Sequence, residues 1–145
     1  MLCQSARLPL VILLLLPLVA VPGQPKPTKT QYFETTEAGF VTLYPSSDSK
    51  YDLALSVADE LSRPVFLQVI YENPENRDEP DLQIAVVNAR QTIVRLESRV
   101  LKGFKNRKKY TVVVEIYSDN RMKQKLGEHI QVVQYIAIPD GVQLH

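Results

Sequence analysis

Cysteine is nearly absent from this chain of 145 residues, which has one cysteine, no tryptophan and only two histidines. The cysteine, Cys3, precedes a long apolar run that we expect to be removed, so the remaining chain has no thiol. Without a thiol it can form no disulfide, bind no metal through cysteine and use no cysteine nucleophile. The sequence therefore predicts a fold that is held together by apolar burial and hydrogen bonds.

Motifs for catalysis and cofactor binding are also missing. His145 is the last residue, and His129 has no acid or nucleophile that can be assigned to it from the sequence. The five glycines do not cluster, which excludes a glycine loop for phosphate. We therefore expect a protein that is not an enzyme and has no cofactor and no metal site. A small hydrolase that uses two of the 16 acidic residues is a third hypothesis.

Net charge is balanced and points to no class of partner. Arg7 is the only charged residue among the first 23, so residues 24–145 carry 16 basic and 16 acidic side chains. A neutral domain has no strong long-range field for a nucleic acid, and we expect no such partner. Charge is uneven only locally: residues 95–109 contain seven bases and one acid, and residues 72–81 contain five acids and one base.

The N-terminus has the pattern of an export signal. Residues 1–23 join one basic side chain to an apolar run and then to small residues, and the run is too short and too interrupted by Pro9 and Pro17 to span a bilayer. Cleavage after Ala20 or after Gly23 fits, and we favour the second. No Asn-x-Ser/Thr sequon occurs. We expect a secreted or periplasmic protein with no membrane span in the mature chain.

The rest of the chain predicts one all-β domain. Residues 24–30 contain two prolines and no large apolar side chain, so we expect a flexible spacer there, followed by a domain at 31–139 and a tail at 140–145. Short apolar alternations bounded by turn residues predict about seven antiparallel strands in two stacked sheets. These alternations lie at residues 41–44, 51–57, 65–72, 82–86, 94–100, 109–117 and 129–138.

One segment carries a family resemblance. From Leu101 to Asp119 the chain has a Leu-x-Gly turn and then Tyr110, which opens an alternating strand. This segment resembles the passage between the fifth and sixth strands of fibronectin type III and immunoglobulin-like domains. The resemblance implies that the Tyr110 hydroxyl bonds back to the preceding loop as a tyrosine corner. A transthyretin-like or cadherin-like sandwich remains the alternative.

An apolar sheet face is the main candidate site. If the alternation places Val65, Val69, Val112, Val114, Ile130 and Val132 in the core, six other apolar side chains face outwards. In the topology that the resemblance implies, their three strands are neighbours in one sheet. A contiguous apolar patch on a sheet surface indicates an interface for a protein partner or a second copy. The six residues are Phe66, Ile70, Val113, Tyr117, Val133 and Tyr135.

Two charged segments are the remaining candidates. The basic segment, with Lys102, Lys105, Arg107, Lys108 and Lys109, gives the alternative function of an adhesion module that binds an anionic glycan or surface polymer. The acidic segment offers oxygen atoms to calcium, but its spacing matches no ordered coordination loop, so we expect a solvated loop. Its acids are Glu72, Glu75, Asp78, Glu79 and Asp81.

Overall fold

The computed structural model describes residues 25–43, 46, 48–57 and 63–139, which form seven strands and no helix. Within these residues no helix could therefore cross a membrane. The predicted signal peptide and C-terminal tail lie outside the described residues. The strands are β1 (Phe33–Leu43), β2 (Asp48–Val57), β3 (Val65–Tyr71), β4 (Asp81–Val87), β5 (Ile93–Glu97), β6 (Lys109–Tyr117) and β7 (Lys125–Gln134).

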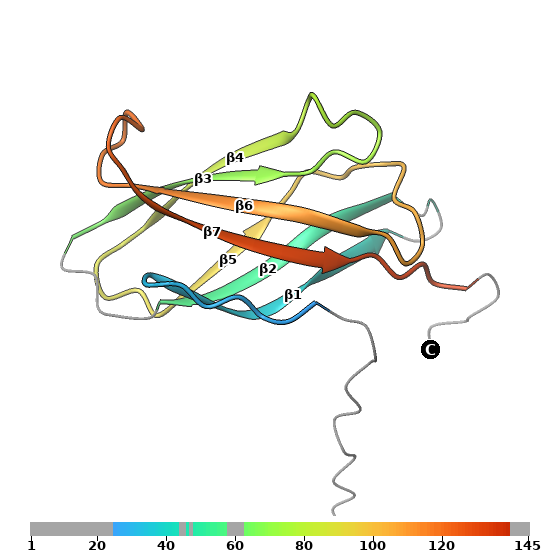
Figure 1. Ribbon diagram of the computed structural model, residues 1–145, viewed down its shortest axis with the longest axis horizontal. Coiled ribbons are helices and arrows are strands. Elements are labelled where there is room, and N and C mark those ends of the chain that lie inside the picture. The colour runs from blue at the N-terminus through green and yellow to red at the C-terminus, as the bar shows by residue number, and fades with distance from the viewer. Residues whose placement is uncertain (1–24, 44–45, 47, 58–62, 140–145) are drawn as a thin grey trace, which may run out of the picture.

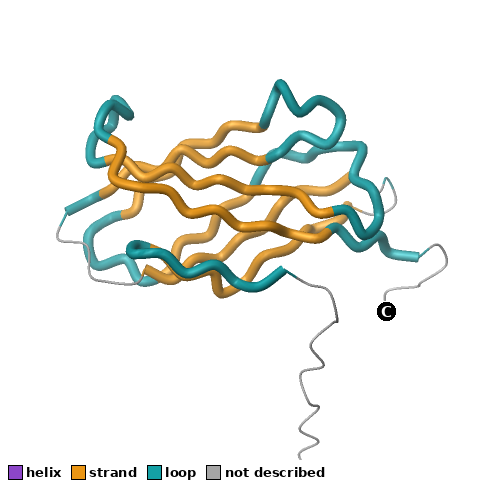
Figure 2. Tube along the Cα trace, viewed as in Figure 1, coloured by secondary structure: helices purple, strands orange, loops and turns teal. Residues whose placement is uncertain are grey.

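The strands form two antiparallel sheets, as the sequence predicted. One sheet has the order β1-β2-β5 and the other the order β4-β3-β6-β7. Figure 1 shows the two layers stacked, with β7 of one sheet near β1 of the other. Figure 2 shows that loops close both ends of the sandwich, so the chain passes between the sheets at its ends. The all-β prediction is confirmed.

The core lies between the two layers, and most of its side chains come from alternating positions along the strands. In β3 and β6 every second residue is buried, which is the pattern of strands whose other face is turned outwards. Six aromatic rings fill one end of the core. Their centroids lie 4.7–6.2 Å apart, the range of favourable ring contacts, and they belong to Phe40, Tyr51, Tyr71, Phe104, Tyr110 and Tyr135.

The predicted orientation of β7 is wrong. Val133 and Tyr135 are buried in the core, whereas Ile130 is exposed and Val132 lies half-buried on the outer face. The strand also begins earlier than expected and includes Gly127. The sequence contains apolar residues in both alternating phases here, so hydrophobicity alone does not decide the orientation. Tyr135 joins the aromatic cluster, which favours the phase that is observed.

Two polar side chains of β7 are buried on the same side of the strand as Val133. Their burial is possible because the segment before β1 supplies hydrogen-bond partners. His129 lies between the hydroxyls of Thr35, 2.8 Å from Nε2, and Thr30, 3.1 Å from Nδ1. The Gln131 side chain accepts from the Thr28 amide and donates to the Lys26 carbonyl. Residues 26–30, expected to be a flexible spacer, are thus bonded to β7, and this segment precedes β1 at the bottom of Figure 1.

The hydrogen bonds of His129 fit a neutral ring. Thr30 donates its hydroxyl proton to the Phe33 carbonyl, so it accepts from His129 Nδ1, and Nε2 then accepts from Thr35. A second ring proton would meet the Thr35 hydroxyl proton, which would have to turn away. Burial lowers the pKa of His129 below its ordinary value of 6.5, which also favours the neutral form.

Folding stability is therefore expected to depend on His129 in mildly acidic solution. The unfolded chain binds a proton at this ring more readily than the folded chain, so its contribution is complete above pH 6.5 and is lost as the pH falls below that value. Urea unfolding at pH 7.5 and pH 5 measures this loss. His129→Gln keeps a polar side chain that does not titrate, and its loss should be smaller. Equal losses in the two proteins would contradict the assignment.

Tyr110 makes the contact that the resemblance implied. Its hydroxyl accepts a hydrogen bond from the Lys105 amide at 2.8 Å, five residues upstream. The loop that reaches this contact turns at Gly103, which has a φ of 81°. A Cβ at Gly103 would lie 2.8 Å from the Glu75 side chain, so both backbone and space require glycine. The turn and the tyrosine together fix the entry of the chain into β6.

Candidate protein interface

The outer face of the four-stranded sheet carries two rows of apolar side chains. The strand registers place Leu82, Ile70, Val113 and Ile130 side by side, one from each strand. A second row joins Val86, Phe66 and Tyr117 in the same way. Side chains that are directly opposite on one face of an antiparallel pair lie within contact distance. We call the outer apolar face the set Leu82, Ile84, Val86, Phe66, Ile70, Val113, Tyr117, Ile130 and Val132.

The edges of this face are the most exposed. Ile84 on β4 is 72% exposed, and Leu82, Val86 and Ile130 are between 42% and 49% exposed. Single exposed apolar residues are ordinary, but a row that continues across four strands is not. An antiparallel sheet that faces water normally places polar residues outside.

A short polar stripe separates the two apolar rows. Lys125 donates to both Glu115 and Glu128, at 2.8 and 3.0 Å, and the Tyr117 hydroxyl donates to Glu115. The hydrogen bonds from Lys125 and Tyr117 lower the pKa of Glu115, and the bonds to both carboxylates raise the pKa of Lys125. The charges of the stripe are therefore largely paired before anything binds, with one carboxylate in excess.

The opposite face of the molecule provides a comparison. The outer surface of the β1-β2-β5 sheet is crossed by ion pairs, in which Arg95 contacts Glu37 at 2.7 Å and Asp52 at 3.2 Å, and Lys50 contacts Glu97. This is the surface expected of a sheet that faces water. The two sheets of one domain thus differ, and only the four-stranded sheet has apolar rows across all its strands.

Four of the six residues that the sequence predicted for an interface lie on this face. Phe66, Ile70, Val113 and Tyr117 belong to the outer apolar face, although only 9% of Tyr117 is exposed. Val133 and Tyr135 do not, because β7 has the opposite orientation. The residues that the prediction missed are Leu82, Ile84, Val86, Ile130 and Val132. The alternation at residues 82–86 predicted the strand β4. It did not predict that the apolar residues of this strand lie on the outer face.

Four of the five predicted basic residues lie on the loop between β5 and β6, and the fifth, Lys109, begins β6. Lys102 lies 3.9 Å from Asp48, and Lys108 lies 5.1 Å from the centre of the Tyr110 ring. Lys105, Arg107 and Lys109 are exposed and have no carboxylate within 4.0 Å among the described residues. The acidic segment approaches this loop, since Gly103 lies against Glu75. The loop 118–124, with Arg121 and Lys123, lies at the other end of β6.

The acidic segment is a loop that leads into β4. Glu75, Asp78 and Glu79 are exposed, whereas Glu72 pairs with Arg77 at 3.1 Å and Asp81 is buried. Within the described part of the chain, no three side chains of His, Cys, Asp or Glu converge as a metal site would require. The segment therefore presents separate carboxylates rather than a set of ligands.

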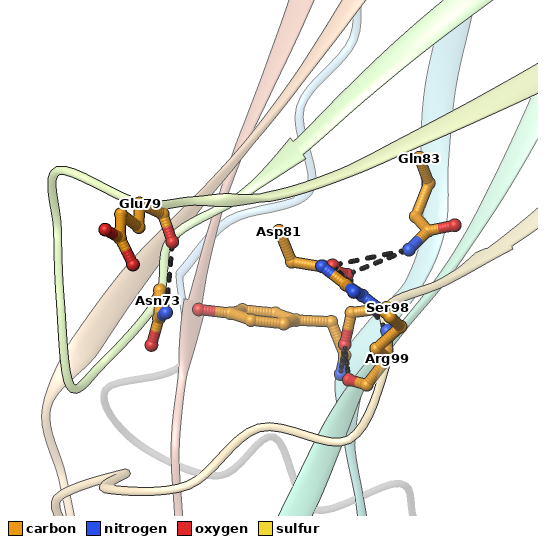
Figure 3. A network of polar contacts seen from close by, with 7 residues as sticks. Asn73, Glu79, Asp81, Gln83, Ser98 and Arg99 are labelled. Atoms are coloured by element: carbon orange, nitrogen blue, oxygen red, sulfur yellow. Dashed lines mark hydrogen bonds and ion pairs between the residues drawn. The ribbon is translucent and has the colours of Figure 1, made fainter.

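Asp81 connects the two sheets at the β4 side of the sandwich. It accepts from the backbone amide of Arg99 at 2.9 Å, from the Arg99 guanidinium and from the Gln83 amide, a cluster seen in Figure 3. Burial alone would raise the pKa of Asp81, but the hydrogen bonds from Arg99 and Gln83 outweigh burial and hold it below its ordinary value. The carboxylate is thus a fixed anion of the fold.

A small open groove lies between β1 and the residues that follow β7. Its lining contains Phe40, Ile136 and Ile138 with Ala38, Gly39, Thr42 and Gln134. No side chain in this lining titrates near neutral pH, and its one hydroxyl, that of Thr42, has no general base beside it among the described residues. The lining of the groove therefore offers no catalytic group.

No protein-family model matches this chain, and no curated protein matches it significantly. The candidate interface therefore depends on the geometry of the face alone.

Proposed function

We propose that the chain is a non-enzymatic, exported interaction module whose outer apolar face binds a partner protein or a second copy. The observation that supports this most strongly is the apolar row that crosses all four strands, from Leu82 on β4 to Ile130 on β7. Burial of exposed apolar area releases about 25 cal/mol per Å², so a surface that covers the row gains stability in proportion to its contact area.

The polar stripe adds specificity to such a contact. Two carboxylates share Lys125, so a partner that covers the face finds one excess negative charge between two apolar rows. A partner with apolar side chains on both sides of one cation or hydrogen-bond donor would match this surface. A uniformly apolar partner would leave Glu128 without a full set of hydrogen bonds, which costs binding energy.

We infer a fibronectin III-like or immunoglobulin-like scaffold for this module. Support comes from the contact of Tyr110 with the Lys105 amide and from the strand order. The fourth strand lies beside the third, as strand C′ does in variable immunoglobulin domains. A scaffold of this kind carries many unrelated binding sites, so it does not by itself name the partner.

Binding of an anionic polymer by the basic loop is the second candidate. The exposed cations Lys105, Arg107 and Lys109 favour it, since no carboxylate within 4.0 Å in the described chain neutralises them. The neighbouring acidic loop opposes it, because its exposed carboxylates repel the same ligand. The uninterrupted apolar row, which has no such opposition, is therefore the stronger candidate.

Site-specific photo-crosslinking in the producing cells tests the proposed interface. With benzoylphenylalanine placed at residue 82 or 130, the two ends of the apolar row, we expect adducts of one and the same mass. That mass shows whether the partner is another protein or a second copy. Val113→Lys lies between the two positions and should reduce both adducts about tenfold or more, since an unpaired charge in an apolar contact costs over 1.4 kcal/mol.

Ile93 provides the matched control position. It is 62% exposed, more than Ile130, but lies on β5 in the other sheet. Adducts of equal yield at residue 93, or none at residues 82 and 130, would reject the proposed face. Thermal unfolding of Val113→Lys shows separately that the variant is folded.

A further inference from the structure

The free edge of β4 lacks the features that normally prevent strands from pairing between molecules. β4 pairs with β3 over seven residues without a register shift, so it is a regular strand with one unpaired side. Its sequence, Asp-Leu-Gln-Ile-Ala-Val-Val, has no lysine, arginine, proline or glycine. Its only charge, Asp81, is buried and bonded to Arg99. Such an edge presents free backbone donors and acceptors beside apolar side chains.

The other three edges of the two sheets are protected. β1 contains a β-bulge between Thr35 and Glu37, and β5 has only five residues, with Arg95 and Glu97 among them. β7 has a register shift opposite Tyr117 and begins at Lys125. Bulges, short strands and charges are the usual means by which an edge avoids pairing. Of the four sheet edges in the described chain, β4 alone is therefore left open to pairing with another strand.

We propose that β4 pairs antiparallel with β4 of a second copy, which joins two four-stranded sheets into one of eight strands. In the register centred on Ile84, this residue faces its own copy, Leu82 faces Val86, and Gln83 faces Ala85. All seven residues find a partner in this register, and no two like charges meet. The apolar rows of both copies then lie on one continuous surface.

Charge beyond the strand ends supports the same register. It brings Arg90, which follows β4, towards Asp78 and Glu79 in the loop that precedes β4 of the other copy. Within the described residues none of these three side chains has an opposite charge within 4.0 Å, and all three are exposed. The two-fold symmetry makes this contact twice. A second copy is therefore complementary both along the strand and at its ends.

Disulfide formation at residue 84 tests the pairing directly. In a Cys3→Ser chain, so that the new thiol is the only one, Ile84→Cys places two cysteines opposite each other across the symmetry axis. Opposed residues of antiparallel strands have Cα atoms about 4.5–5.5 Å apart, which a disulfide can bridge. Under mild oxidation we expect a covalent dimer to form about tenfold faster or more than with Ile93→Cys, because pairing raises the local thiol concentration.

Two charge variants test the register. In Leu82→Lys/Val86→Glu each lysine faces a glutamate of the other copy, whereas Leu82→Lys/Val86→Lys brings lysines together. Sedimentation velocity should show a dimer for the first and a monomer for the second, with both folded because the two positions are half-exposed on an edge. The same oligomeric state in both variants, or equal oxidation rates at residues 84 and 93, overturns the proposal. A partner bound only on the outer apolar face would still crosslink at residue 130, so the two proposals fail separately.

Discussion

Tyr135→Ala is expected to lower the free energy of unfolding by about 3–5 kcal/mol, the usual cost of removing a buried aromatic ring. Only 4% of Tyr135 is exposed, and its ring packs 5.2 Å from both Phe40 and Phe104. Truncation leaves a cavity beside Phe40 and Phe104, which the surrounding rings can fill only in part. Urea unfolding monitored by tyrosine fluorescence or circular dichroism measures the loss.

Ile130→Ala is the matched control, because Ile130 lies on the outer face of β7, whereas Tyr135 directly follows β7 and is buried in the core. Ile130 is 42% exposed, so we expect a change below about 1 kcal/mol. The order of the two effects is a test of the orientation of β7. If Ile130→Ala were the more destabilising variant, the strand would have its apolar residues in the opposite phase.

The orientation of β7 shows what alternation alone cannot decide. The run His129 to Ile136 contains apolar residues in both phases, and hydrophobicity favours burying Ile130 and Val132 over His129 and Gln131. The observed phase depends on partners that are about 100 residues away, Thr30 for His129 and Thr28 for Gln131. A buried polar side chain is tolerated once its hydrogen bonds are made. Only the folded arrangement shows that they are.

The strands β3 and β6 are the opposite case. In each of these strands one phase is wholly apolar and the other contains polar residues, and the predicted burial of Val65, Val69, Val112 and Val114 is confirmed. The contact between Tyr110 and the loop before it was implied by the resemblance of residues 101–119, whose motif is short and local in sequence. Features that depend on neighbouring residues were thus accessible from the sequence.

The candidate interface was predictable only in part for the same reason. Phe66, Ile70 and Val113 follow from the phases of β3 and β6, whereas the contribution of β4 depends on which strand lies beside β3. The sequence shows an apolar alternation at residues 82–86 but not that its apolar side is turned outwards. Strand order is a long-range property, and it decides how wide the apolar rows are.

Asp81→Ala is expected to cost about 3 kcal/mol of folding stability, near the lower end of the effect of breaking a buried charged pair. The carboxylate is almost fully buried, and its removal leaves the Arg99 amide without its acceptor. The Arg99 side chain is 74% exposed, so water can hydrate its guanidinium, which limits the loss. Urea unfolding at pH 7 measures it, and Asp78→Ala in the exposed loop before β4 should change stability by less than about 0.5 kcal/mol.

The pH dependence of an Asp81→Asn variant separates charge from shape. Because the pKa of Asp81 is lowered by folding, its anion stabilises the folded chain above its ordinary value of 3.8, and this contribution is lost as the pH falls through the lower, folded pKa. The stability gap between the natural chain and Asp81→Asn should therefore be widest above about pH 5 and narrow towards pH 2. A gap that stays constant over this range would mean that Asp81 acts through its shape and not through its charge. Since Asp81 begins β4 and Arg99 follows β5, the same anion then determines how firmly the edge strand is held to the opposite sheet.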